Sequence, residues 1–410
     1  MMNTVLSGRI DNAGRWAAIA IGCAIPVSVV LDNLLLLVVL VCWLAGGNYV
    51  HKLAKLRDNP VSLCALALFG LLLLGLLWGD QPVEDGRRYL LKYLDLAFVP
   101  LFIYYFRNPA TRRHGLLALA STLALVLALS FLVKAGLLAQ GGWVQGSPQS
   151  PVVFKFRITH NFLMAFGAFL YTWLAFSAPA GSRGRIFWGL LAMLAAVNVT
   201  LMVEGVTGYL ALGVLALLLV ATLLPRRIAI AGFIAVPLLA LALLAVPGPL
   251  AQRIVTLNQE LQSWHPDVAA RDSSAGLRIE FYRNTLEIIA DHPLIGTGTG
   301  GLPTAYADRV RGTDMLATHN PHNEYLHIAV QIGLLGLTAM LLMFAVQWRS
   351  ARQLPTAQES GLARGLVLAM AVGCLFNSML LDHAEGLFFA WLSGLLFAGL
   401  PGKKTIGISS

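Results

Sequence analysis

THNPHNEYLHIAVQIGLLGL, residues 318–337, passes from polar to apolar within a few positions and determines how the chain around it folds. Its first ten residues hold three histidines and two asparagines, whereas its second half is apolar. A helix that starts near Leu326 can enter a bilayer, and an ionisable residue at such a place is a functional-site candidate by default. The stretch therefore predicts a membrane span with a polar site at its start.

Apolar runs of about 20 residues, each long enough to cross a hydrocarbon core of ~30 Å as a helix, recur along the whole chain. The 410 residues are 57% hydrophobic and 12% charged, with a mean hydropathy of +0.72, whereas a soluble domain has about a quarter charged residues. Since a helix is the only non-barrel structure that satisfies the backbone in lipid, we predict an all-α polytopic membrane protein. The first run is interpreted as a retained anchor, and the four cysteines, all within predicted spans, indicate no disulfide framework.

About twelve transmembrane helices are predicted, and the chain divides into three parts. Residues 1–247 hold helices 1–9 with short loops, 248–325 form one large periplasmic loop with amphipathic helices, and 326–410 hold helices 10–12 and a cytoplasmic tail. The positive-inside rule places 17 of the 29 Lys and Arg residues, together with both termini, in the cytoplasm. The predicted spans are 16–31, 33–49, 60–78, 89–106, 115–134, 161–177, 187–203, 207–224, 228–247, 326–347, 363–381 and 386–400.

The large loop contains one well-marked helix. Ser273 or Ser274 is a suitable N-cap, and the segment 291–293, with its proline, is expected to end the helix. An apolar face is predicted from spacings of three and four, and its members are Ile279, Tyr282, Leu286 and Ile289. The GTGTGG run at 296–301 is expected to be flexible or tightly turned, and the loop as a whole to form a lid or cavity wall.

His322 and Arg278 are the leading candidates for chemistry. His322 stands at the start of a span, and Arg278 offers a planar guanidinium that suits phosphate oxygens; an interfacial solvated histidine and a snorkelling arginine are the alternatives. His319 and His322 could share a helical face, but His327 is turned about 140° from His322 at 3.6 residues per turn. Metal ligation by the three histidines is therefore unfavourable, and no metal or cofactor is predicted.

Two further groups carry charge near predicted spans. Lys155, Arg157 and His160 alternate with phenylalanines before a span, so they either hold a lipid-linked phosphate or anchor the helix. Asp382 lies in a tight turn between the last two spans, where its carboxylate could orient His322 or Arg278. Glu204 is interpreted as structural.

The segments GLRIEFYRNTLEIIADHPLIGTGTGGLPTAY (276–306) and HNEYLHIAVQIGLLGL (322–337) resemble the signature region of the O-antigen ligase and polymerase superfamily. The resemblance is greatest to the ligase branch, which implies a GT-C-like glycosyltransferase in the bacterial inner membrane. Such enzymes transfer polysaccharide from undecaprenyl diphosphate to the lipid A–core acceptor without metal or nucleotide. The family's histidine and loop arginine map onto His322 and Arg278, but its third arginine is replaced by Val206 here, a role that Arg157 or Arg88 could fill.

The resemblance implies an inverting transfer with His322 as general base or acceptor-orienting group and Arg278 as a catalytic diphosphate ligand. The remaining expected substrate-binding residues are Arg157, Lys155, Arg88, Arg271, Arg283, Asn323, His160, His319 and Asp382. A polymerase or a protein O-oligosaccharyltransferase of the same superfamily would use the same groups. An anionic-lipid transporter is the alternative from a different class.

Overall fold

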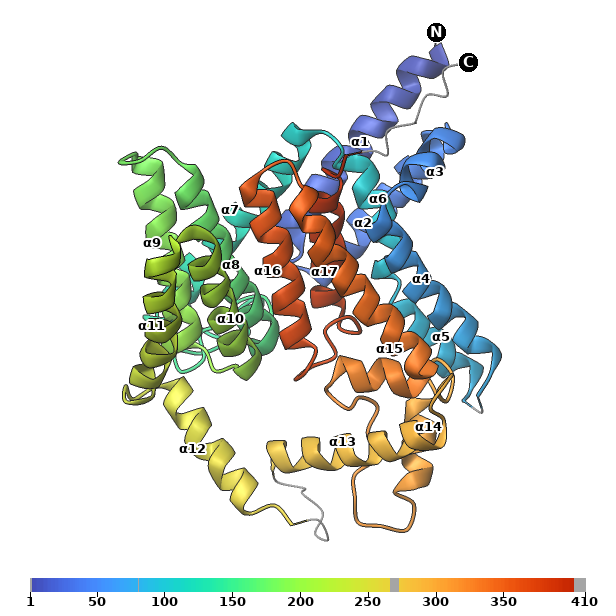
Figure 1. Cartoon of the computed structure of the whole chain (residues 1–410), viewed down its shortest axis with the longest axis vertical. Helices are drawn as coiled ribbons and strands as arrows, with labels where there is room; N and C mark the ends of the chain where they lie inside the picture. The colour runs from blue at the N-terminus through green and yellow to red at the C-terminus, as the bar shows by residue number, and fades with distance from the viewer. Residues whose placement is uncertain (1, 80, 266–272, 402–410) are drawn as a thin grey trace.

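The computed structural model describes residues 2–79, 81–265 and 273–401. Within these ranges the chain is helical without a β-strand, and extended pairing is limited to two isolated bridges, Gly141–Val144 and Ser147–Ser150. Apolar helices form one bundle, and the helices of residues 249–309 cover one of its ends (Figure 1). The predicted all-α class is therefore confirmed for the described residues.

Each of the twelve predicted spans falls mainly on one helix of the bundle, although 16–31 also includes the first residues of the next helix. The bundle helices are α1 (Met2–Ala24), α2 (Val29–Ala45), α4 (Pro60–Leu74), α6 (Asp95–Tyr105), α7 (Pro109–Lys134), α8 (Arg157–Ser177), α9 (Arg183–Val197), α10 (Val206–Leu223), α11 (Arg226–Leu244), α15 (Glu324–Ser350), α16 (Ala357–Gly373) and α17 (His383–Phe397). The other elements are α3 (Tyr49–Arg57), α5 (Val83–Lys92), α12 (Pro249–Gln262), α13 (Ser274–Asp291), α14 (Leu302–Arg309) and the single turns η1 (Gly75–Leu77), η2 (Asn198–Met202) and η3 (Ala351–Gln353).

Six helices among the described residues are both long and apolar enough to cross a membrane. They are Pro60–Leu77, Pro109–Lys134, Arg183–Met202, Val206–Leu223, Arg226–Leu244 and Glu324–Gln353. Two more, α2 and α17, are apolar but shorter. These helices make the chain a multi-pass membrane protein, while the count of about twelve crossings and the GT-C-like architecture stay predictions.

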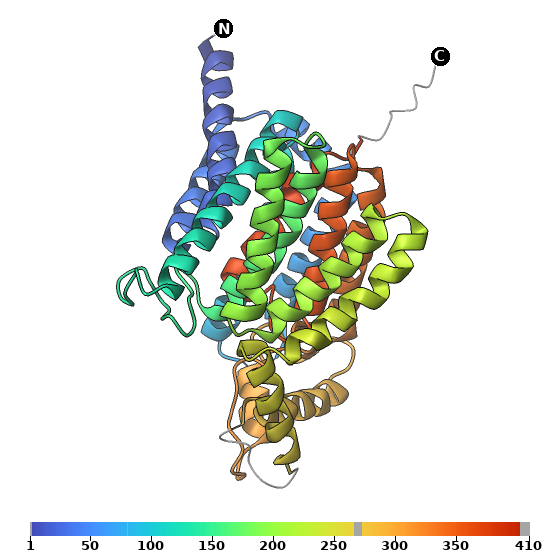
Figure 2. The same ribbon diagram turned by 90° about the vertical axis from the view of Figure 1, so that its left-hand side faces the viewer.

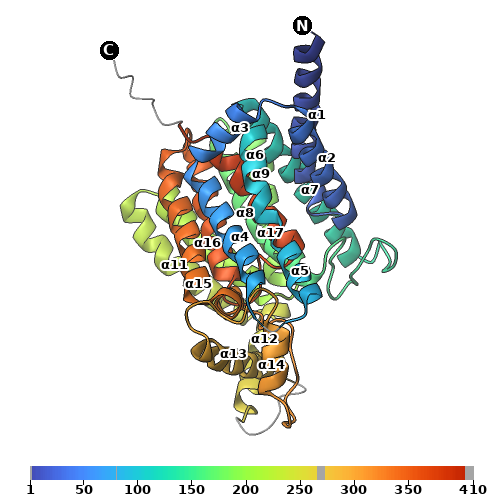
Figure 3. The same cartoon turned by 90° about the vertical axis from the view of Figure 1, so that its right-hand side faces the viewer.

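The helices of the bundle run up and down between two ends (Figures 2 and 3). One end, which we call the loop end, carries α12, α13 and α14 together with the turn between α16 and α17. The opposite end carries α3 and the short connections between α8 and α9 and between α10 and α11. The two sets of loops that the charge pattern separated thus lie at different ends of the bundle, and their cellular compartments stay a prediction.

Helix α17 forms the centre of the bundle and is buried from Ala384 to Phe397. It packs against α6 and α16. The Trp391 indole is fully buried and donates a hydrogen bond to the Ala18 carbonyl at 2.7 Å. Gly22 lies so close to that indole that a methyl group there would clash with it. These contacts fix α1 to α17.

Helix α15 is broken at Ile332 and Gly333, which have non-helical backbone angles. The predicted span at 326–347 is therefore wrong as one continuous helix. Its first piece, up to Gln331, lies crosswise at the loop end, and the second piece runs into the bundle (Figure 1). A break in a buried helix leaves backbone N–H and C=O groups that must find other hydrogen-bond partners. Sequence periodicity alone does not predict which residues supply those partners.

The GTGTGG run supplies the partners. Thr297 and Gly298 donate their N–H groups to the carbonyls of Val330 and Gln331 at 2.8 and 2.9 Å. Thr299 donates to Gly75 at the end of α4, at 2.9 Å. Gly296, Gly298 and Gly300 all have positive φ, so the run is tightly turned, as one of the two predicted alternatives required.

Helix α13 begins and ends as predicted, but its buried face differs. Ser273 is the N-cap and accepts from the Gly276 N–H, and His292 is the C-cap. The buried positions include Phe281, Asn284 and Ile288, whereas Leu286 is 53% exposed. The predicted face was wrong because α13 packs through Phe281 and Ile288 against Leu302 and Tyr306 of α14 and Val330 of α15.

Replacing Gly333 by alanine is expected to destabilise the protein. Gly333 has φ +64° and ψ −163°, a region that is essentially restricted to glycine and costs other residues about 1–3 kcal/mol. A Cβ there would also lie 2.2 Å from the Leu294 carbonyl group. Thermal unfolding in detergent should show a lower midpoint for Gly333→Ala. Gly70→Ala, where a Cβ meets open space, is the control, and equal midpoints for both variants would contradict this account of the break.

Candidate active site

The His322 backbone is held in a conformation that only a few per cent of non-glycine residues adopt. Its φ is +57°, and its N–H donates to Asn320 Oδ1 at 2.8 Å. The same oxygen accepts from the Ser378 hydroxyl in the α16–α17 turn at 2.6 Å. Strained residues of this kind cluster at functional sites, and here the strain is maintained by side chains from two separate segments.

The His322 imidazole lies against the middle of α13. It stacks on Phe281, with ring centroids 6.4 Å apart and an angle of 29°. The neighbouring Tyr282 hydroxyl hydrogen-bonds the carbonyls of His322 and Leu375, at 3.1 and 3.0 Å. Both residues of α13 therefore fix where the imidazole stands relative to the α16–α17 turn.

Arg278 lies one helical turn before Tyr282 and shares the His322 site. Burial lowers the pKa of His322 below its ordinary value, and the nearby Arg278 charge lowers it further. Burial likewise lowers the pKa of Arg278, and the charges of Arg253 and Arg157 act in the same direction. The two leading sequence candidates are thus brought together, as predicted from the loop and span that carry them.

Two arginines pair with two glutamates beside this site. Arg253 of α12 lies 3.5 Å from Glu260 and 3.9 Å from Glu204, and Arg157 of α8 lies 3.5 Å from Glu204. Together with Arg278 they form what we call the arginine cluster: Arg157, Arg253 and Arg278. Glu260 also accepts from the Ala275 N–H at 3.0 Å, which ties α12 to the start of α13.

Arg253 was not predicted as a site residue. Its side chain is only 13% exposed. The sequence around Arg253 does not predict its ion pairs, because Glu204 lies in the turn before α10 and Glu260 lies seven residues further along α12. Glu204, interpreted as structural, immediately precedes Gly205 and Val206, where α10 starts. Arg157 therefore does reach the neighbourhood of Val206, whereas Arg88 lies exposed on α5.

A buried carboxylate anchors the polar stretch that holds His322. Glu324 Oε1 accepts from the Tyr93 hydroxyl at 2.7 Å, and Oε2 accepts from the N–H groups of Leu380 and Leu381 at 2.8 and 3.2 Å. Its own N–H donates to the Cys374 carbonyl at 2.8 Å. Glu324 thus joins the start of α15 to α5–α6 and to the α16–α17 turn, directly beneath His322.

A chamber of about 750 Å³ lies beside the arginine cluster. Arg157, Lys155 and Asp382 line it, along with His383 and Glu385 at the start of α17. The Lys155 ammonium is 3.9 Å from Asp32, and its side chain is 10% exposed. Burial lowers the pKa of Lys155. Three of the predicted substrate-binding residues therefore gather at one cavity that meets the site at Arg157.

Other predicted site residues have structural partners. His160 is 2% exposed, and its Nε2 donates to Asn198 Oδ1 at 3.1 Å. Asn323 caps α15 by accepting from the Leu326 N–H, and its amide donates to the Leu375 carbonyl at 3.1 Å. Both side chains support the walls of the site through hydrogen bonds within the protein.

The remaining candidates lie further out. His319 is exposed, and its carbonyl accepts from the Tyr89 hydroxyl at 2.6 Å. Arg283 is 54% exposed and pairs with Glu287 at 3.4 Å. Arg271 lies outside the described residues. His327 is fully buried and stacks on Tyr89, with centroids 5.6 Å apart, so it does not share a ligand set with His322.

Part of the chain matches a known protein family. Residues 188–341 match the family model described as O-antigen ligase. The match covers well under half of the chain but includes Arg253, Arg278, His322 and the Glu204 turn. The match is consistent with a member of the O-antigen ligase superfamily, whose members are glycosyltransferase-like enzymes acting on lipid-linked glycans.

One solved structure is similar to most of the chain. It is described as "Structural coordination of polymerization and crosslinking by a peptidoglycan synthase complex" and has 17% identity over 83% of this chain and 96% of that chain. The TM-score of 0.47 is too low for the likeness to assign a fold or an activity. No curated protein matches the chain.

Glu324→Gln is expected to destabilise the loop end. Three donors point at the two carboxylate oxygens, and an amide would turn its NH₂ toward at least one of them, leaving buried groups unpaired. Such a loss costs about 1–3 kcal/mol, which thermal unfolding in detergent should detect. Glu84→Gln, at a 72% exposed side chain, should shift stability by no more than about 0.5 kcal/mol. A Glu324→Gln protein as stable as that control would show that the carboxylate anchors nothing.

Proposed function

We propose that the protein is an O-antigen ligase that transfers a polysaccharide from undecaprenyl diphosphate to the lipid A–core acceptor. The observation that carries this proposal is the shared site of His322 and Arg278, inside the region that matches the O-antigen ligase family. The proposal places the chain in the bacterial inner membrane, with the loop end in the periplasm and both termini in the cytoplasm. The charge bias of the short loops at the opposite end supports this orientation.

The arginine cluster is proposed to bind the diphosphate of the donor. Breaking the bond between sugar and phosphate develops negative charge on the leaving diphosphate, and fixed cations stabilise that charge most in the transition state. Arginine remains charged and offers a planar fork to phosphate oxygens. In this proposal Arg253 and Arg157 supply the positive charge that Val206 cannot, with Lys155 contributing from the chamber wall.

His322 is proposed to act as the general base. The acceptor is a sugar hydroxyl, which becomes a good nucleophile only when its proton is removed. Burial and the Arg278 charge lower the pKa of His322, so its imidazole is neutral and able to accept a proton at neutral pH. The hydroxyl oxygen then attacks the anomeric carbon opposite the diphosphate, the sugar–phosphate bond breaks, and the configuration inverts.

His322→Ala is expected to lower ligation by about 10²–10³-fold or more, as is typical for the loss of a group acting on the transition state. The measurement is transfer between purified donor and acceptor by reconstituted protein in EDTA, as a function of pH. Because the pKa of His322 lies below about 6.5, the wild-type rate should be constant around neutral pH and fall as acid protonates the imidazole. His265→Ala, a histidine on the same loop, is the matched control. A wild-type acid limb that persists in the residual activity of His322→Ala would contradict the base assignment.

Arg278→Ala and Arg253→Ala are expected to weaken use of the donor, because each removes a cation from the diphosphate site. Arg278→Ala should abolish detectable transfer, and Arg253→Ala should raise the KM for the lipid diphosphate about tenfold, which corresponds to about 1.4 kcal/mol. Arg87→Ala, an exposed arginine paired with Glu84, is the control.

The products of the same cells separate ligase from polymerase. Loss of a ligase leaves long chains on the lipid carrier, whereas loss of a polymerase leaves acceptors capped with single repeat units. Single-unit caps in the Arg278→Ala strain would therefore assign the chain to the polymerase branch.

A KM of Arg253→Ala for the lipid diphosphate equal to that of Arg87→Ala would show that Arg253 does not bind the diphosphate.

A further inference from the structure

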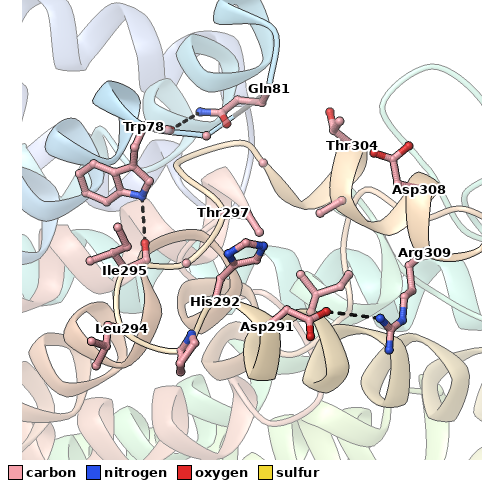
Figure 4. Close-up of a pocket in the computed structure, with 16 residues that line it drawn as sticks. Trp78, Gln81, Asp291, His292, Leu294, Ile295, Thr297, Thr304, Asp308 and Arg309 are labelled. Carbon is pink, nitrogen blue, oxygen red and sulfur yellow. Dashed lines mark hydrogen bonds and ion pairs between the residues drawn. The ribbon is translucent and has the colours of Figure 1, made fainter.

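A groove of about 840 Å³ lies at the far end of α13 from Arg278 (Figure 4). Its floor and walls come from the turn after η1, the end of α13 and the start of α14. In Figure 4 the His292 imidazole lies between the Trp78 indole and the ion pair of Asp291 with Arg309. The mechanism proposed above uses none of these residues.

The groove is held in shape by contacts from behind. The Trp78 indole N–H donates to the Ile295 carbonyl at 3.0 Å, which fixes the ring. Gln81 donates to the Thr299 carbonyl at 3.1 Å, so the η1 turn is tied to the GTGTGG run. Because that run also fills the break in α15, the groove and the His322 site rest on the same segment.

The lining favours a hydroxyl-rich ligand over an anion. Arg309 is already paired with Glu287 and with Asp291, the latter at 3.3 Å. Asp291 and Asp308 are themselves paired with Arg309 and Arg311, but their side chains are 61% and 56% exposed, and each carboxylate has further lone pairs that can accept from ligand hydroxyls. Trp78 adds a large apolar surface beside these polar groups, and His292 and Thr304 add donors and acceptors. A few polar groups beside an aromatic surface are the usual composition of a small-molecule site, and here they match the apolar faces and hydroxyl edges of sugars.

The distance to the reacting centre suits a chain of several sugars. Thirteen residues of α13 separate Arg278 from Asp291, which places the two about 20 Å apart at 1.5 Å per residue. The donor's first sugar is bonded to the diphosphate, so its later sugars must extend away from the arginine cluster on the loop end. Both sites lie on this end and on one rigid helix.

We propose that this groove binds the glycan chain of the donor, several sugars from the diphosphate. The inference rests on the proposed function for the identity of the chain, but saccharide binding can be measured without any transfer. Binding there would favour donors that carry long glycans, because only these reach from Arg278 to Trp78.

The test uses full-length protein in nanodiscs and soluble oligosaccharides released from the cell's own lipid-linked glycan, as a single repeat unit and as longer chains. Wild type should bind the longer chains at least tenfold more tightly than the single unit. His292→Ala and Asp308→Asn should each remove most of that difference, and His265→Ala and Glu84→Gln should keep it. Trp78→Phe, which retains an aromatic ring, should have an intermediate effect.

Two further measurements keep this proposal separate from the proposed function. Arg278→Ala should retain the affinity for the soluble chains even though transfer is lost. In the transfer reaction, the ratio of kcat/KM for long against short donors should fall about tenfold in His292→Ala. If the wild type binds long chains without transferring them, the ligase proposal is wrong and the assignment of the groove as a glycan-binding site is retained. Equal affinity for long and short chains, an unchanged His292→Ala protein, or binding of the released acceptor core in place of the donor chain would overturn the groove assignment.

Discussion

The buried carboxylate of Glu324 is the constraint on which the candidate site depends. It gathers the Tyr93 hydroxyl and two backbone N–H groups of the α16–α17 turn onto one side chain. A fully buried carboxyl group with three donors is stable only while those donors stay in place, because a buried polar group without a hydrogen-bond partner is costly. Three segments far apart in the chain are thus fixed around the start of α15, and His322 stands two residues before it.

The broken helix extends this framework toward the large loop. Stopping α15 at Gly333 leaves the carbonyls of Val330 and Gln331 available, and the GTGTGG run of the loop occupies them. The run is therefore a structural part of the bundle, and α13 starts and ends at fixed places relative to it. Arg278 and His322 lie near each other because the loop and the start of α15 are both attached at the break in α15. The same attachment explains why the GTGTGG run is rich in glycine.

Local signals in the sequence were sufficient to locate most of the helices. Apolar runs located the bundle helices, and Ser273 and the Asp291–Pro293 segment located α13. Sequence spacing could not reveal long-range pairs, so the ion pair of Arg253 with Glu204 went unrecognised. The capping of α15 by Asn323 was likewise not predicted. The apolar face of α13 was misassigned for the same reason, because its partners on α14 and α15 decide which side is buried. The number of crossings and the roles of all the candidate site residues stay predictions.

The arginine cluster has a charge balance suited to a ligand that arrives and leaves. Arg157 and Arg253 are satisfied by Glu204 and Glu260 at 3.5–3.9 Å, distances at which the pairs are loose, and Arg278 adds a third positive charge beside them. Two carboxylates against three guanidiniums leave one excess positive charge in a half-buried setting. A lipid diphosphate would replace loose carboxylate contacts with charge-assisted bonds, and the glutamates would compensate the arginines again once the carrier departs. In the proposed reaction, the acids beside the cluster would weaken binding of the product carrier, which a site made of arginines alone would hold too tightly for turnover.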